Sequence, residues 1–150
     1  MNNEVKDMYI PKEAEKEIIF MLHNYKNIKD LIEKRKIDII DTMKVTNKAH
    51  LNAIHNIDNN TLEFIVEKID TDYNIQRLKK WSRVINTFCS KLYDEEDKFY
   101  YYFLKYKYFR KMNEEFIKEK LNITGSRFKD IDIYLKWLLY QNSIEAKLFK

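Results

Sequence analysis

The sequence predicts an all-α protein, with long amphipathic helices in its N-terminal half and a helix-turn-helix domain at its C-terminal end. The 150 residues include one Gly and one Pro, too few to punctuate strands and hairpins. Apolar residues recur at three- and four-residue intervals over long stretches, which is the helical period. Hydrophobic residues at 45% against 35% charged residues are typical of a globular chain and not of a disordered one.

The first helix is expected from about residue 12 to residue 37 or slightly beyond. Pro11 suits the start of a helix, where its missing N–H costs nothing. Residues 1–10 are expected to form a frayed leader. Residues 44–60, rich in Asn, are expected to form a loop with at most two helical turns. One face of the helix carries the apolar residues Ala14, Ile18, Leu22, Tyr25, Ile28 and Ile32.

A second long helix is expected to begin at Thr61, a good N-cap residue, and to weaken or bend between Asp70 and Asn74. Its apolar residues are Leu62, Ile65, Ile69, Leu78, Trp81, Val84, Ile85 and Phe88. These patterns divide the chain into an N-terminal helix and loop (1–60), a linking helix (61–92) and a C-terminal domain (93–150).

A third helix, from about residue 95 to residue 110, carries a run of aromatic residues. Such a run invites a nucleic-acid stacking hypothesis. The spacing of Phe99, Phe103, Tyr106 and Phe109 is helical, however, and a stripe of this kind usually packs into a core. We therefore expect the stripe to be buried, and the remaining tyrosines to be available to phosphate through their hydroxyls.

Residues 112–140 read as a short helix, a tight turn and a longer helix. Asn113 and Thr124 are N-cap residues for the two helices. Asn122 lies where such motifs place a residue in the left-handed conformation, which Asn tolerates best after Gly. The expected buried stripe of the second helix is Phe128, Ile131, Leu135 and Leu138. This is the pattern of a helix-turn-helix whose second helix enters the DNA major groove; the alternative is a helical hairpin within an ordinary bundle.

The first two turns of the second helix face outward in this interpretation and form the predicted reading surface. Arg127 and Lys129 can donate to guanine or phosphate, and Ser126 to either. The carboxylates of Asp130 and Asp132 would repel phosphate. They would be favourable only if they accept a hydrogen bond from cytosine N4 or interact with the positive end of the helix dipole. The predicted reading residues are Thr124, Ser126, Arg127, Lys129, Asp130 and Ile133.

The net charge of +4 and the pI near 8.9 permit nucleic-acid binding without requiring it. Between residues 98 and 111 the charged residues are all basic, directly before the motif. An ordinary solvated helix face is the alternative. Lys118 stands where these motifs usually have a small residue, which allows the two helices to pack closely. Close packing is still possible if the aliphatic part of the Lys118 side chain lies on apolar surface and its ammonium stays in water. The predicted phosphate contacts are Lys107, Arg110, Lys111 and Lys118.

Other kinds of site find little support. His50 and His55 are about 140° apart on a helix and cannot share a metal on one face. Carboxylate pairs such as Asp94 with Asp97 lie on solvated segments, so surface charge explains them better than magnesium. The single Gly excludes a glycine-rich phosphate loop, and no activated nucleophile is visible. We expect no metal, no cofactor and no catalytic residue, and hence not an enzyme.

The compartment follows from Cys89 and from hydropathy. A single Cys cannot form an internal disulfide, which favours a reducing cytosol. No signal peptide is visible, and no apolar run approaches the roughly 20 residues that span a bilayer. A cytoplasmic protein is therefore expected.

The C-terminal third resembles region 4 of sigma factors. The matching segments are FYYYFLKYKYF, then EEFIKEKLNIT, then SRFKDIDIYLKWL, within residues 99–138. The whole layout is similar to the ArpU and RinA families of phage-encoded late transcription regulators. There, an N-terminal helix with a tyrosine-lysine signature (here His23 to Lys36) precedes a loop and a long helix ending in RLKKWSRVINTF (Arg77 to Phe88).

The resemblance implies a phage or prophage regulator that binds DNA upstream of late genes and activates them with host RNA polymerase. The expected partners are double-stranded DNA and that polymerase, and the long helices are compatible with a homodimer. Two alternatives remain. One is a small terminase subunit, which assembles into a ring for DNA packaging. The other is a sigma-like or anti-sigma interaction module that does not bind DNA alone.

Overall fold

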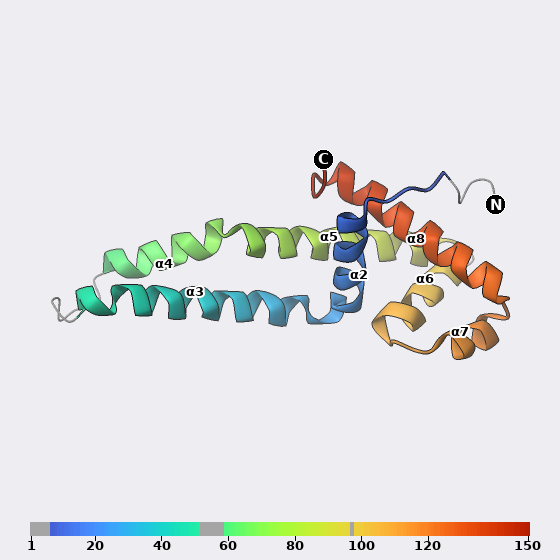
Figure 1. Ribbon diagram of the computed structural model, residues 1–150, viewed down its shortest axis with the longest axis horizontal. Helices are drawn as coiled ribbons and strands as arrows, with labels where there is room; N and C mark the ends of the chain where they lie inside the picture. The colour runs from blue at the N-terminus through green and yellow to red at the C-terminus, as the bar shows by residue number, and fades with distance from the viewer. Residues whose placement is uncertain (1–6, 52–58, 97) are drawn as a thin grey trace. The chain divides into compact units, whose positions relative to one another are not determined.

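The described residues form helices joined by turns and contain no strand, which confirms the predicted all-α class. The computed structural model describes residues 7–51, 59–96 and 98–150, with side chains for 7–43, 62–96 and 98–150. In chain order the elements are α2 (Lys12–His23), the 3₁₀ turn η1 (Tyr25–Asn27), α3 (Ile28–Leu51), α4 (Asn59–Thr71), α5 (Tyr73–Asp94), α6 (Phe99–Leu104), the π-helical turn η2 (Lys105–Phe109), α7 (Glu114–Leu121) and α8 (Gly125–Glu145) (Figure 1).

Two compact units contain these elements. The first comprises residues 1–26 and 80–150, and the second comprises residues 27–79. The units differ from the three segments expected from the sequence, because α2 packs against α8 from the far end of the chain. Local periodicity gives no information on such a pairing.

The predicted continuous helix over 12–37 is wrong, because the chain breaks at Asn24. The Asn24 backbone N–H and its side-chain amide both donate to the Phe20 carbonyl, at 3.0 and 2.8 Å. Asn side chains compete with the backbone for helical hydrogen-bond partners in this way. The chain then passes through η1, where the Tyr25 hydroxyl donates to the Asn86 side chain, and α3 begins.

The expected loop over 44–60 is wrong at both of its ends. The backbone of α3 stays helical through Leu51, and α4 begins at Asn59, so Thr61 lies inside the helix and not at its cap. The polar composition misled the prediction, because intrinsic propensities differ by less than about 1 kcal/mol per residue outside Gly and Pro. Residues 52–58, including His55, lie outside the described residues, as do residues 1–6 of the expected leader.

The bend expected between Asp70 and Asn74 is confirmed as a break at Asp72, between α4 and α5. The Asp72 carboxylate accepts from the Ile75 backbone N–H at 3.1 Å and so caps α5. It also accepts two hydrogen bonds from the Arg35 guanidinium, at 2.9 and 3.1 Å. The bidentate contact with Arg35 lowers the pKa of Asp72 and ties α3 to the junction.

Within the second unit, α3 and α4 lie side by side and run in opposite directions (Figure 1). Ile39 and Met43 of α3 form one buried cluster with Ile75, which lies in the first turn of α5. The residues packed around them are Ile32, Ile65 and Ile69. This core is a single seam along a helical hairpin.

The first unit has a larger core, in which α2 covers α8. Glu15 of α2 lies 3.1 Å from the Lys136 ammonium of α8. Cys89 is buried on α5, and burial raises the pKa of its thiol to about 12. The buried apolar residues of this core are Ala14, Ile18, Met21, Leu22, Trp81, Ile85, Phe88, Cys89, Leu92, Phe103, Leu104, Tyr108, Ile117, Phe128, Ile131, Leu135, Leu139, Tyr140 and Leu148.

The aromatic stripe predicted before the motif is only partly correct. Phe103 is fully buried, but the other deep residues are Leu104 and Tyr108; Phe99, Tyr106 and Phe109 are half-buried. The reason is η2, where the Arg110 N–H donates to the Lys105 carbonyl at 2.8 Å, one residue further back than in an α-helix. The wide turn changes the rotation per residue, so α-helical spacing misplaces the buried side beyond Leu104.

Candidate nucleic-acid interface

The turn between α7 and α8 has the local geometry that the sequence predicted. Asn113 caps α7, its side chain accepting from the Phe116 N–H at 2.8 Å. Asn122 is left-handed, with φ 54° and ψ 55°. Thr124 caps α8, its hydroxyl accepting from the Arg127 N–H at 3.2 Å. Caps at both helix starts and a left-handed Asn between them fix where α8 begins and how it leaves the turn.

Lys118 folds over this turn. Its side chain is 24% exposed, and its ammonium lies 2.8 Å from the exposed Glu115 carboxylate. The same ammonium would lie 3.8 Å from a Cβ built on Gly125, so the lysine stem runs toward the start of α8. The hydrogen bond from Lys118 to Glu115 raises the pKa of the ammonium. The Lys118 side chain thus lies along the protein surface, although a small residue is usual at this position of the motif.

The first two turns of α8 present three polar side chains to solvent. Ser126, Arg127 and Lys129 are exposed, and Asp130 and Ile133 are half-buried. Lys129 has no ion pair among the described residues. The Arg127 guanidinium lies 5.8 Å from the centre of the Phe99 ring, which positions the side chain along the rim of α6. The sequence-predicted reading residues therefore do gather on one end of α8.

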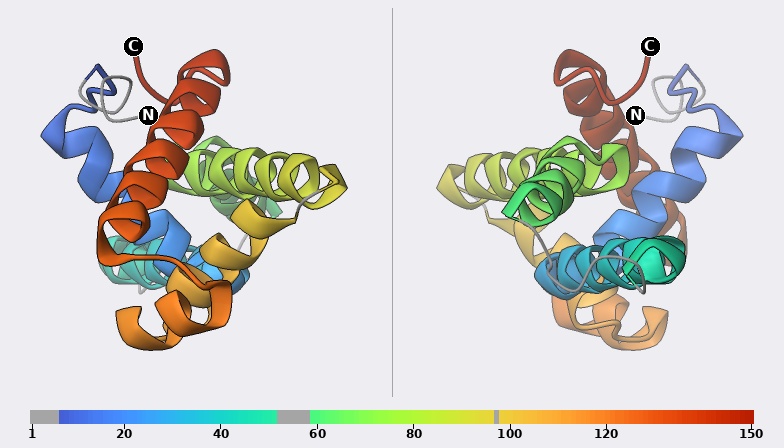
Figure 2. Two further views of the ribbon diagram at one scale, coloured as in Figure 1. Left: turned by 90° about the vertical axis from the view of Figure 1, so that its right-hand side faces the viewer. Right: turned by 90° about the vertical axis from the view of Figure 1, so that its left-hand side faces the viewer.

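The opposite side of α8 is buried, so the helix has a clear inner and outer face at this end. The buried apolar residues are Phe128, Ile131, Leu135 and Leu139, of which the last replaces the predicted Leu138. Phe128 packs against Phe103 of α6, with ring centroids 5.1 Å apart. Figure 2 shows α6 and α7 gathered at the N-terminal end of α8, while α2 lies further along it.

Asp132 is inside the protein, where the sequence had suggested that it might face DNA. The residue is 8% exposed, and its carboxylate accepts a hydrogen bond of 2.5 Å from the Tyr108 hydroxyl. Two ammonium groups lie beside it, Lys107 at 2.7 Å and Lys136 at 3.3 Å. Lys136 also reaches Glu15. We call Asp132, Tyr108, Lys107, Lys136 and Glu15 the Asp132 network; it ties η2, α8 and α2 together.

This network affects the ionisation of its neighbours. Burial, and then the negative charge of Asp132, raise the pKa of the Tyr108 hydroxyl well above its usual value. Burial and the nearby charges of Lys111 and Lys107 lower the pKa of His23, whose ring lies 5.1 Å from that of Tyr108. Both shifts favour the neutral form of the ring.

The network was not predicted from the sequence, although a signal was present. Asp132 follows Phe128 by four residues and precedes Leu135 by three, so it lies on the buried stripe itself. Lys136, four residues further, was in position to compensate it. A carboxylate at a position where the helical period places buried residues indicates a buried ion pair. Burying a charge without a partner has a large unfavourable free energy.

The predicted phosphate contacts now divide into two groups. Arg110 and Lys111 are exposed and have no ion pair among the described residues; Lys111 has a left-handed backbone, with φ 52°. Lys107 is different, because its ammonium is bound to Asp132 and lies 5.0 and 5.2 Å from the rings of Tyr108 and Phe128. It would have to leave a buried carboxylate to reach a phosphate, so it is a poor phosphate ligand.

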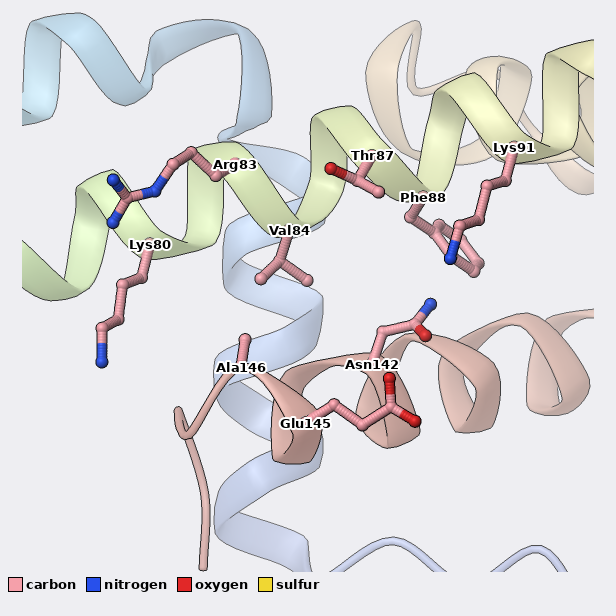
Figure 3. Close-up of a pocket in the computed structure, with 9 residues that line it drawn as sticks. All are labelled: Lys80, Arg83, Val84, Thr87, Phe88, Lys91, Asn142, Glu145 and Ala146. Atoms are coloured by element: carbon pink, nitrogen blue, oxygen red, sulfur yellow. The ribbon is translucent and has the colours of Figure 1, made fainter.

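A separate groove of about 390 Å³ lies between α5 and the C-terminal end of α8 (Figure 3). Lys80, Arg83 and Lys91 stand on its rim and have no ion pair within the part of the chain that the structure describes. Its other lining residues are Val84, Thr87, Phe88, Asn142, Glu145 and Ala146. Asn142 lies 15 residues beyond Arg127, or about 22 Å along the helix axis. This groove is therefore distinct from the exposed first turns of α8.

We compared the chain with protein-family models, with curated proteins and with solved structures. None of the three comparisons finds a match. The assignment of a function consequently depends on the residues and on their arrangement.

Two further findings concern other classes of site. The described residues hold no group of three or more His, Cys, Asp or Glu side chains that could bind a metal ion. None of the described helices has the length and apolarity that crossing a bilayer requires.

Proposed function

We propose that the protein is a sequence-specific, duplex-DNA-binding transcription regulator of phage type, in which α6, α7 and α8 form a helix-turn-helix domain. The single observation that supports this most strongly is the start of α8. A capped turn with a left-handed Asn122 leads into a helix start at which Ser126, Arg127 and Lys129 are exposed. An α-helix presented in this way fits the major groove, which is about 12 Å wide.

The roles of the exposed residues follow from their chemistry. Arg127 and Lys129 donate to guanine O6 and N7 or to an adjacent phosphate, and Ser126 donates to either. Arg110 and Lys111, just before α7, neutralise phosphates at the edge of the groove. Lys118 contributes less, because its ammonium is shared with Glu115.

The burial of Asp132 favours this proposal. A carboxylate facing DNA would repel the phosphates, and Asp132 is instead neutralised by Lys107 and Lys136 inside the protein. Asp130 remains half-buried at the surface. We assign it to cytosine N4 recognition or to the favourable interaction of a carboxylate with the N-terminal half of α8.

The regulatory part of the proposal comes from the resemblance to the ArpU and RinA families. On this resemblance, the protein acts in the cytoplasm of a bacterial host. It binds upstream of late genes and activates them together with host RNA polymerase. The α5–α8 groove, about 22 Å along α8 from Arg127, would remain accessible to a protein partner while the first turns of α8 contact DNA.

Selection of bound duplexes from a random pool tests the proposal. We expect enrichment of one defined sequence after several rounds, with a salt slope of about −4 to −5 for four to six phosphate contacts. If duplexes are retained but no sequence is enriched, the protein binds DNA without sequence specificity, which would contradict the proposal. No retention at low salt, together with binding to a polymerase column, would favour the interaction module.

A further inference from the structure

The α3–α4 hairpin buries only one seam. Ile39 and Met43 of α3 are buried there, with Ile65 and Ile69 of α4 packed against them. Two helices alone cannot cover the flanks beside such a seam, because an amphipathic helix normally buries a stripe more than about 100° wide. Apolar side chains on the flanks are therefore left exposed.

One flank of this second unit carries exposed apolar side chains. Leu62 and Val66 of α4 are 53% and 56% exposed. At about 100° per residue they lie about 40° apart around the helix axis. Ile69, half-buried, lies between them and the core. We call Leu62 and Val66 the α4 stripe. Phe64, which is 56% exposed, lies on the opposite flank, where it lines a pocket with Asp38 and Thr42 of α3.

The same face of the hairpin includes part of α3. Each helix can be viewed from its own N-terminus, and its residues rotated away from the seam in the clockwise sense. Because α3 and α4 run in opposite directions, this rotation leads to the same face of the pair on both helices. On α3 these residues include Lys36 and Ile40. On α4 the outer edge of the stripe carries Asp70, which has no ion pair among the described residues. Among the described residues, the ion-pair partner of Lys36 is Glu33 of its own helix.

We propose that this face binds a second copy of the chain, so that two hairpins form a four-helix bundle. In the two-fold arrangement, the α4 stripe of each copy packs on α3 of the other, near Ile40. Asp70 then lies close to Lys36 of the second copy, whereas packing α4 on α4 would bring acidic edges together. The contact is isologous, and it closes at two subunits.

The available area agrees with a stable dimer. The part of α3 with described side chains, residues 28–43, is about 24 Å long, and two helices side by side are about 20 Å across. This part of the face offers about 480 Å² per copy, or about 1,000 Å² for two copies. That total is close to the lower limit for a specific interface, about 1,000 Å². A second hairpin is the occupant whose length, apolar stripe and charge pattern match this face.

Sedimentation equilibrium of the full chain tests the proposal without DNA. We expect a species of twice the 18.5 kDa chain mass across a micromolar concentration series. Val66→Glu should raise the Kd of the dimer at least about 100-fold, because it buries a charge without a partner. Phe64→Glu is the matched control, since Phe64 is on the same helix and equally exposed. It should leave the dimer intact, and circular dichroism should show unchanged helicity in both variants.

Other outcomes would overturn the inference. A monomeric wild-type chain would show that the face has no second copy on it, and a species of eight or more subunits would indicate a ring. Dissociation by Phe64→Glu and not by Val66→Glu would place the contact on the other face. The readout is independent of the proposed function, because DNA binding is measured separately on the same variants.

A second measurement tests the packing of α4 on α3. Val66→Cys and Ile40→Cys proteins are mixed and treated with a short bismaleimide. We expect cross-linked heterodimers in excess of either homodimer, with little background from the buried Cys89. An excess of Val66→Cys homodimers would contradict the proposed arrangement.

Discussion

Replacing Asp132 with alanine is expected to lower the free energy of unfolding by about 3 kcal/mol or more. Removing this carboxylate leaves the Tyr108 hydroxyl without its acceptor and the ammonium of Lys107 without its counter-ion. Lys136 keeps only Glu15. Breaking a buried ion pair on one side costs more than the pair itself contributes, because the remaining charge is desolvated without compensation.

Urea denaturation followed by far-ultraviolet circular dichroism measures this loss. Asp130→Ala is the control, because Asp130 is on the same helix, two residues away, and has no ion pair among the described residues. Its free energy of unfolding should change by no more than about 0.5 kcal/mol. Equal losses in the two variants would mean that the Asp132 network does not hold α2 and η2 to α8.

Replacing Lys129 with alanine is expected to weaken binding to the selected duplex by about 1–3 kcal/mol, or about 5- to 150-fold, and to relax specificity at one base pair. Lys129 is exposed on the second turn of α8 and has no ion pair among the described residues. Replacing Lys111 with alanine should instead weaken all duplexes alike and reduce the salt slope by about 1, because a phosphate contact carries no sequence information.

Fluorescence anisotropy with the selected duplex and with a random duplex, over a series of salt concentrations, separates the two effects. Lys129→Ala should change the ratio of the two affinities, and Lys111→Ala should change both affinities and leave their ratio constant. If the two substitutions weaken both duplexes to the same extent, the proposed division between base and phosphate contacts is wrong.

Short-range features of the α7–α8 turn could be predicted from the sequence. The caps at Asn113 and Thr124 and the left-handed Asn122 depend on residues within four positions of one another. The inner face of α8 follows from the helical period, with Leu139 in place of Leu138. Local preferences and the tertiary structure agree in this region, so the prediction holds.

The features that were missed depend on distant contacts or on small local differences. The packing of α2 on α8 joins residues more than 100 positions apart, as in the contact between Glu15 and Lys136. The break at Asn24 depends on one side chain competing for the Phe20 carbonyl. The π-helical turn after Leu104 shifts the buried side of an otherwise regular pattern. None of these changes the apolar spacing that the prediction used.

Photo-cross-linking from the two ends of α8 tests the central claim most directly. A thiol-reactive photoprobe is attached to Ser126→Cys, at the start of the helix, or to Glu145→Cys, at its end and about 28 Å away. Cys89 is buried with a thiol pKa of about 12, so the wild-type chain gives the labelling background. With the selected duplex, we predict cross-links to major-groove base edges from position 126 and none above background from position 145. Cross-links from position 145 alone, or equal cross-links from both positions, would contradict the claim that the first turns of α8 read DNA.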